Sequence, residues 1–165
     1  MVSHRVIPVL LLSNKGLVKT KQFKNPTYVG DPINAIRIFN EKEVDELVFH
    51  DINASKQGRK PDFKLIESIA SECFMPLGYG GGISELDDIS KLFKIGVEKV
   101  ILNSIVFIKP EIITKAAKIA GNQSVVVSID IKKNWLGKRK VYSHVSKKLM
   151  DENPIDFALR MQRIG

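Results

Sequence analysis

The sequence has almost no cysteine and no long apolar run. Its single cysteine, Cys73, excludes a disulfide or a cysteine metal cluster within these 165 residues, and such usage is typical of a reducing cytoplasm. No apolar stretch reaches the roughly 18 residues that a membrane-spanning helix requires. The N-terminal apolar segment is too short and too poorly flanked for a secretory signal peptide. We therefore expect a cytoplasmic protein with no membrane partner.

Positive charge, by contrast, is in excess. The 26 lysines and arginines outnumber the 18 acidic residues and give a net charge of +8, a balance that first suggests nucleic acid. The lysines are scattered, however, and the denser stretches at 15–24 and 132–148 lack the interleaved aromatics of a base-stacking surface. A positively charged entrance to a binding site for a phosphorylated small molecule explains the charge equally well. We therefore expect a phosphorylated substrate and no nucleic acid, with most lysines on a solvated surface.

Apolar segments alternate with helical patterns along the whole chain. Buried strands are expected at residues 5–12, 46–52, 73–77, 99–102 and 124–130, and helices are expected to begin near residues 31, 61, 84, 110 and 154. Strands that are apolar on both faces and alternate with helices indicate a parallel sheet covered by helices. Each unit has roughly 30 residues, the period of a (β/α)8 barrel. The sequence thus predicts an α/β fold of this barrel type, with about its first five units.

Two longer connections interrupt this pattern. Residues 13–28 are expected to form a long, lysine-rich loop, and loops of this length are usually functional. Residues 132–145 are expected to leave the alternation as an excursion, with a hairpin turn at 136–138. Asp31 and Pro32 have the residue types of an N-cap and a first helical position, so a helix is expected to begin there.

The stretch from Leu77 to Ile83 contains three consecutive glycines, Gly80, Gly81 and Gly82. Glycine removes side chains where backbone N–H groups approach a neighbour closely, and the helix that follows offers a partial positive charge. Both features suit a phosphate group. A plain turn between strand and helix explains the same residues, and the run alone does not decide between the two.

Polar residues follow several expected strands: Asp51, Gly80 to Gly82, Asn103, Ser104 and Asp130. Barrels and open α/β sheets both place their sites at these carboxyl ends. No metal or organic cofactor is expected, because His4 and His144 are far apart and have no carboxylates at ligand spacing.

The chain resembles the cyclase subunit of imidazole glycerol phosphate synthase and its paralogues. The matching pieces, in order, are Arg5-Val-Ile-Pro, Val18-Lys19, Phe23, Gly30-Asp31-Pro32, Asp45-Glu-Leu-Val-Phe with Asp51-Ile52, Gly80-Gly-Gly-Ile, Lys99-Val with Asn103, and Val125-Val-Val with Ile129-Asp130. The resemblance implies a (β/α)8 barrel that receives ammonia from a glutaminase partner at its N-terminal face. It also implies conversion of a phosphoribulosyl-formimino aminoimidazole ribonucleotide to imidazole glycerol phosphate, for histidine synthesis.

The same resemblance implies roles for individual residues. Asp130 matches one of two catalytic carboxylates. The implied substrate and phosphate contacts are Lys19 in a flexible loop, Asp51, Gly81, Gly82, Asn103 and Ser104. Arg5, Glu46 and Lys99 match three of the four charged residues around the ammonia entrance, and a buried charged layer closing the barrel bottom is the structural alternative.

Two departures from the family pattern matter. Leu11 stands where the family has its other catalytic aspartate, and losing one proton-transferring group typically costs about 10²- to 10⁴-fold in rate. The first strand resembles paralogues thought to pass ammonia to a nucleotide-activated sugar in surface-polysaccharide synthesis, which is the alternative function. A non-catalytic scaffold that binds a glutaminase is a third.

The second departure is length, because such barrels need roughly 250 residues. We expect residues 1–165 to form a single domain, the N-terminal part of a barrel that is truncated or partly ordered. A natural half-barrel completed by association is the alternative.

Overall fold

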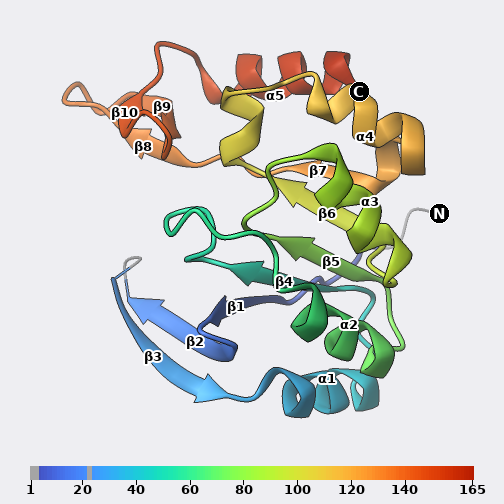
Figure 1. Ribbon diagram of the computed structural model, residues 1–165. Coiled ribbons are helices and arrows are strands. Elements are labelled where there is room, and N and C mark those ends of the chain that lie inside the picture. The colour runs from blue at the N-terminus through green and yellow to red at the C-terminus, as the bar shows by residue number, and fades with distance from the viewer. Residues whose placement is uncertain (1–3, 22–23) are drawn as a thin grey trace. The chain divides into compact units, whose positions relative to one another are not determined.

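The protein is described from a computed structural model that covers residues 4–21 and 24–165 (Figure 1). Phe23, one of the residues that carries the family resemblance, lies outside the described residues. The chain divides into two compact units, residues 1–100 and 101–165, and each is described by itself. The expectation of a single domain stays a prediction.

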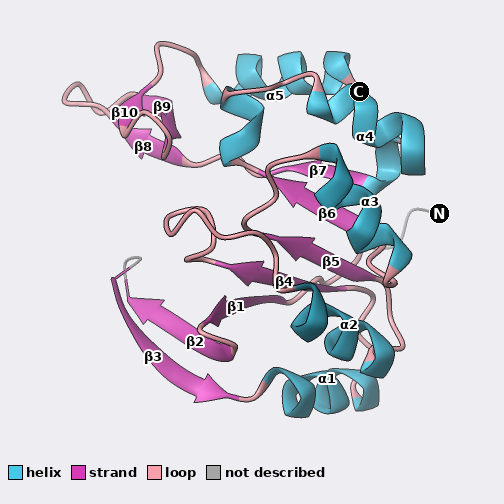
Figure 2. Ribbon diagram, viewed as in Figure 1, coloured by secondary structure: helices cyan, strands magenta, loops and turns pink. Residues whose placement is uncertain are grey.

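The first unit is built on a sheet with the strand order β3-β2-β1-β4-β5 (Figure 2). Its strands are β1 (Val9–Ser13), β2 (Gly16–Lys21), β3 (Lys24–Gly30), β4 (Leu47–Asp51) and β5 (Leu77–Gly80). Strands β1, β4 and β5 are parallel, with Leu11 of β1 opposite His50 of β4, and His50 opposite Gly80 of β5. The parallel sheet that the alternation predicted is therefore present in this unit.

Three helices follow these strands: α1 (Pro32–Glu41), α2 (Phe63–Glu72) and α3 (Leu86–Lys94). The cap expected for α1 is confirmed, because the Asp31 carboxylate accepts the N–H of Ile33 at 2.9 Å. The carboxylate of Asp62 caps α2 in the same way and accepts the N–H of Leu65 at 3.2 Å. Side-chain oxygens at these positions satisfy backbone donors that have no partner within the helix.

The core of the first unit lies between the sheet and these helices. Its fully buried side chains include Ile36, Leu47, Phe49, Ile66, Ile69 and Ile89. Buried apolar residues lie three or four positions apart in each helix, so they share one helix face; the pairs are Pro32 and Ile36, Ile66 and Ile69, and Ile89 and Leu92. Burying each such side chain contributes about 1.5–3 kcal/mol. This packing fixes the carboxyl ends of β1, β4 and β5, where the site residues lie.

Two sequence predictions about the first strand and its connection are wrong. Residues 13–28 are not a loop, because β2 and β3 extend the sheet as antiparallel strands. The turn between β1 and β2 uses Asn14 and Lys15, both at positive φ (49° and 68°), as two-residue hairpin turns require. The first strand begins at Val9 instead of Arg5, and the preceding Val6 is 73% exposed.

The second unit holds the end of β6 (Lys99–Leu102), a short 3-10 helix η1 (Ser104–Phe107), α4 (Ile112–Ala120), a second 3-10 helix η2 (Asn122–Ser124), β7 (Val125–Val127) and α5 (Pro154–Ile164). Strands β6 and β7 are neighbours, and the N–H of Ser128 donates to the C=O of Leu102 at 2.8 Å. The core includes Ile113, Phe157 and Met161, and the Phe157 ring stacks on Phe107 with centroids 5.2 Å apart. Strand β7 is shorter than predicted.

The predicted excursion is a three-stranded antiparallel sheet. It consists of β8 (Ile131–Lys133), β9 (Arg139–Ser143) and β10 (Lys148–Leu149), with β9 in the middle. The expected turn is confirmed: the side chain of Asn134 accepts the N–H groups of Leu136 and Lys138 at 3.0 and 2.9 Å, and Gly137 has a φ of 76°. Trp135 beside this turn is 90% exposed.

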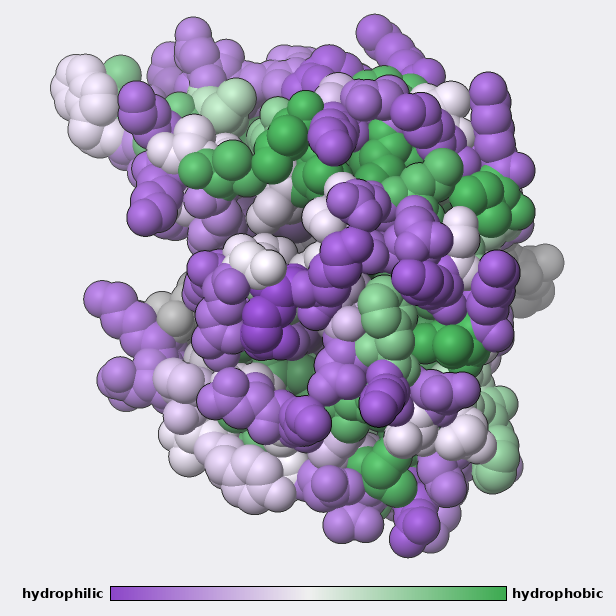
Figure 3. Space-filling view, in the orientation of Figure 1, coloured by the Kyte–Doolittle hydropathy of each residue, from purple (hydrophilic) through white to green (hydrophobic). Residues whose placement is uncertain are grey.

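Charged and polar side chains cover much of the face drawn in Figure 3, with smaller apolar patches between them. This agrees with the expectation that most lysines belong to a solvated surface. Within the described residues, no helix is long and apolar enough to span a membrane.

Candidate functional site

Asp51, predicted to support the site, is the last residue of β4. Its Oδ1 accepts the N–H groups of Asn53 and Ala54 at 2.9 and 3.0 Å. Its Oδ2 lies 3.4 Å from both terminal nitrogens of Arg59. One carboxylate therefore holds both ends of the connection between β4 and α2, and it does so as an ion paired with Arg59.

The glycine stretch lies against that connection. A Cβ at Gly81 would be 2.4 Å from the backbone oxygen of Asp51, and one at Gly82 would be 2.5 Å from the backbone oxygen of Arg59. Both glycines also have positive φ, 119° and 72°. The N–H of Gly82 donates to the Ser55 hydroxyl at 3.2 Å. Packing against residues 51–60 is therefore sufficient to require glycine at both positions.

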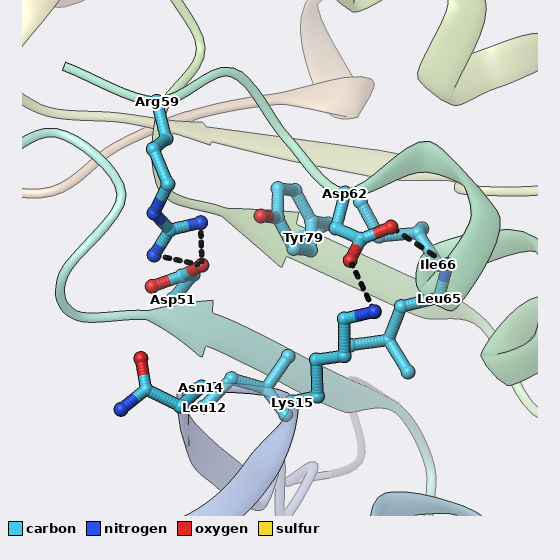
Figure 4. Close-up of a pocket in the computed structure, with 9 residues that line it drawn as sticks. All are labelled: Leu12, Asn14, Lys15, Asp51, Arg59, Asp62, Leu65, Ile66 and Tyr79. Atoms are coloured by element: carbon cyan, nitrogen blue, oxygen red, sulfur yellow. Dashed lines mark hydrogen bonds and ion pairs between the residues drawn. The ribbon is translucent and has the colours of Figure 1, made fainter. Parts of the chain in front are cut away.

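A cavity of about 400 Å³ opens at the carboxyl ends of β1, β4 and β5 (Figure 4). It is lined by Leu12, Asn14, Lys15, Asp51, Arg59, Asp62, Leu65, Ile66 and Tyr79. Lys15 Nζ lies 3.7 Å from Asp62 Oδ2, so each cation in the lining faces a carboxylate. Burial raises the pKa of Tyr79 above its ordinary value, and its ring forms part of the apolar wall. Lys15 and Arg59 were not among the predicted site residues.

The three predicted gate residues come together in the first unit. Glu46, which directly precedes β4, is only 3% exposed, and its carboxylate pairs with Arg5 through one oxygen and with Lys99 through the other. Two cations on one carboxylate offset the cost of burying it. The cluster lies at the amino ends of β4 and β6, the edge of the sheet opposite to Asp51. The structure therefore brings the three residues together, while their role as a gate stays a prediction.

Lys19 does not lie where it was expected. The resemblance placed it in a flexible loop, but it is part of β2 and is paired with Thr27 of β3. Leu17 of β2 is buried and anchors this strand in the sheet. The high lysine content of the segment had led to its prediction as a loop.

The second unit brings together Asn103 and Asp130. Asn103 directly follows β6, and its Nδ2 donates to Asp130 Oδ2 at 2.9 Å and to the C=O of Ser128 at 3.0 Å. Ser104, the neighbouring predicted residue, begins the short helix η1. The amide therefore fixes the carboxylate next to the end of a strand. A carboxylate held in this way and still 36% exposed can accept or donate a proton.

His144, which the sequence reasoning set aside, also lies at this carboxylate. Its Nε2 is 3.3 Å from Asp130 Oδ2. It reaches this position because the N–H of Tyr142 donates to the C=O of Asp130 at 2.8 Å. The hairpin register was the missing signal: β8 and β9 pair so that Tyr142 meets Asp130, and His144 follows in the turn directly after β9.

Among the described residues, no three histidine, cysteine, aspartate or glutamate side chains are grouped so that they could hold a metal ion.

Strands followed by helices, with polar residues at the carboxyl ends of the strands, define the chain as part of a (β/α)8-barrel protein, as predicted. The histidine biosynthesis protein family matches residues 5–165, and the chain belongs to this family.

Among its relatives, "Putative imidazole glycerol phosphate synthase subunit hisF2" of Pseudomonas aeruginosa is 50% identical over the whole chain and 66% of its own length. "Putative imidazole glycerol phosphate synthase subunit hisF3" of Vibrio vulnificus is also 50% identical, over the whole chain and 64% of its length. "Imidazole glycerol phosphate synthase subunit HisF" of Thermococcus onnurineus is 36% identical, over the whole chain and 65% of its length. The chain thus spans just under two thirds of the length of these relatives.

Proposed function

We propose that the chain is part of the ammonia-dependent cyclase subunit of an imidazole glycerol phosphate synthase. The substrate is the phosphoribulosyl-formimino aminoimidazole ribonucleotide, and one product is imidazole glycerol phosphate for histidine synthesis. The observation that carries the proposal is the carboxylate of Asp130, held by Asn103 at the end of a strand in a member of the histidine biosynthesis protein family. The names of the relatives support the same activity.

In this function Asp130 moves protons during ammonia addition and ring closure, which require protons to be both removed and delivered. In the first unit, phosphate binds at the backbone of Gly81 and Gly82 beside the start of α3, where it replaces the Ser55 hydroxyl as acceptor of the Gly82 N–H. Lys19 and Asp51 support the substrate. In the second unit, Asn103 and Ser104 have the corresponding phosphate-binding role.

Ammonia is supplied by a glutaminase subunit that docks at the amino ends of the strands. The cluster of Arg5, Glu46 and Lys99 supports this part of the proposal, because three charged side chains gather there around a buried carboxylate. Such a cluster can open only if its ion pairs separate, so it suits a gate. We place the whole complex in the cytoplasm and the chain in one barrel domain.

Leu11 favours a second candidate function. It lies within β1, opposite His50 of β4 and Val18 of β2, at the position where the family resemblance places a second catalytic aspartate. A leucine cannot transfer a proton. The alternative is a paralogous subunit that delivers ammonia to a nucleotide-activated sugar in surface-polysaccharide synthesis.

The two candidates are separated by an assay of the protein made from its full reading frame. Ammonium and the ribonucleotide are supplied, and imidazole glycerol phosphate is measured for the wild type, Asp130→Asn and Leu11→Asp. Turnover by the wild type that is lost in Asp130→Asn supports the cyclase. A folded wild type without turnover, together with a Leu11→Asp variant that gains it, refutes the cyclase and favours the paralogous function. A folded protein that is inactive in every form also refutes the cyclase, and the paralogous function is then tested with nucleotide-activated sugars as ammonia acceptors.

A further inference from the structure

Among the described residues, two side chains of different chemistry contact the carboxylate of Asp130. Asn103 Nδ2 donates to Asp130 Oδ2 at 2.9 Å, and His144 Nε2 lies 3.3 Å from the same oxygen. All three residues belong to the second unit. An amide NH₂ can only donate a hydrogen bond, whereas an imidazole nitrogen can also take up and release a proton. The asparagine therefore orients the carboxylate, and the histidine is able to exchange a proton with it.

The imidazole is positioned by the hairpin around it. Tyr142 meets His144 edge-on, with ring centroids 4.9 Å apart, and Lys132 Nζ lies 3.2 Å from the centre of the Tyr142 ring. The N–H of Tyr142 donates to the C=O of Asp130, so the backbone sets the spacing between the histidine and the carboxylate. The His144 side chain is 46% exposed, and a proton on it can pass directly to water.

The proposed reaction requires proton transfers that Asp130 and His144 could carry out together. Ammonia addition, elimination and ring closure require one proton to be removed and another to be delivered. With Leu11 at the position of the second family carboxylate, Asp130 must serve both steps. A carboxyl group that has taken up a proton must release it before it can act as a base again. Histidine is the side chain whose charge changes most readily between pH 5 and 8.

We propose that His144 is the proton-exchanging partner of Asp130, an inference that rests on the proposed function. The Asp130 carboxylate takes a proton from the attacking nitrogen and passes it from Oδ2 to the unprotonated Nε2 of His144. The carboxylate is thereby restored, and the imidazolium releases the proton to water. Because His144 acts through Asp130 and does not touch the reacting atoms, it is a positioning residue.

The kinetic test uses the protein from its full reading frame with ammonium as nitrogen source. His144→Gln should lower kcat roughly 10- to 100-fold with little change in KM, and should change the acidic limb of the rate–pH profile, leaving only the limb that belongs to Asp130. His4→Gln, which changes an exposed histidine outside the hairpin, is the matched control and should match the wild type. In an Asp130→Asn background, His144→Gln should cause no further loss, because the two residues act as one unit. An unchanged kcat and pH profile in folded His144→Gln overturns the proposal.

A second measurement does not depend on turnover. The imidazole ¹⁵N signals of the three histidines are recorded by NMR in the wild type and in Asp130→Asn. The signals of His144 should change and those of His4 should not. If the wild type shows no turnover but the His144 signals respond, the cyclase proposal fails and the pair stands. If they do not respond, the pair itself is refuted.

Discussion

Gly82→Ala is the substitution whose effect the structure defines most closely. The residue has a φ of 72°, and a Cβ built there lies 2.5 Å from the backbone oxygen of Arg59 and 2.9 Å from the Cβ of Ala54. Backbone atoms cannot rotate away as the end of a long side chain can. The connection between β4 and α2 must therefore move, or the new methyl group must remain in close contact.

The expected cost has two parts. A left-handed conformation costs a residue with a Cβ about 1–2 kcal/mol, and overpacking a filled site costs about 1–3 kcal/mol. Together they give about 2–5 kcal/mol, a large fraction of the roughly 5–15 kcal/mol that stabilises a typical folded protein. Gly58→Ala isolates the first part, because Gly58 has a similar φ of 62° and no atom within 4 Å of its added Cβ.

Urea unfolding followed by far-UV circular dichroism measures both variants in parallel. With a slope of roughly 2 kcal/mol per molar urea, Gly82→Ala should unfold at least about 0.5 M earlier than Gly58→Ala. Equal midpoints for the two variants would refute the packing explanation for Gly82. In that case the requirement for glycine at position 82 would have to come from a bound ligand and not from packing.

Three further predictions concern other parts of the fold. Glu46→Gln should cost about 1–3 kcal/mol in urea unfolding, because it removes the buried carboxylate that pairs with Lys99; Asp87→Asn, at an exposed ion pair, should cost under about 0.5 kcal/mol. Phe157→Ala should cost about 3–5 kcal/mol in thermal unfolding, because the side chain is 1% exposed, and a loss below about 1 kcal/mol would contradict its place in the core. Burial raises the pKa of the Tyr79 phenol above its ordinary value of 10.0. The stabilisation that the neutral phenol contributes is therefore full below that pH and is lost as the pH rises, because the phenol ionises first in the unfolded chain. Tyr79→Phe should flatten the fall in unfolding free energy between pH 9 and about 11, and an unchanged slope would contradict this.

Local signals account for what the sequence predicted well. Helix α1 begins at Asp31 and Pro32 as expected, and α5 begins at Pro154 as predicted. Capping and a fixed proline φ act within a few residues and can therefore be read from a short stretch of sequence. The hairpin of β1 and β2 was missed because its turn residues, Asn14 and Lys15, include no glycine to mark their positive φ.

The site shows the same division between local and distant signals. The order of strands was enough to place Asp51 at the end of β4 and Asn103 directly after β6, whereas Asp130 lies three residues beyond the end of β7. The contacts of Arg59 and His144 could not be predicted, because they depend on how a loop folds back and on the register of a hairpin. Pairing between distant residues leaves little trace in any one stretch of sequence.

The position of each strand in the first sheet also sets how long its backbone amides resist exchange with deuterium. Strand β4 lies between β1 and β5, and both Leu47 and Phe49 are fully buried. Strand β3 has a neighbour on one side only among the described strands, and nearly all of its residues are exposed. Amides open with free energies that range from near zero in fraying segments to the global value in the core. Exchange should therefore be slowest in β4 and fastest in β3, so the edge opens many times for each opening of the centre.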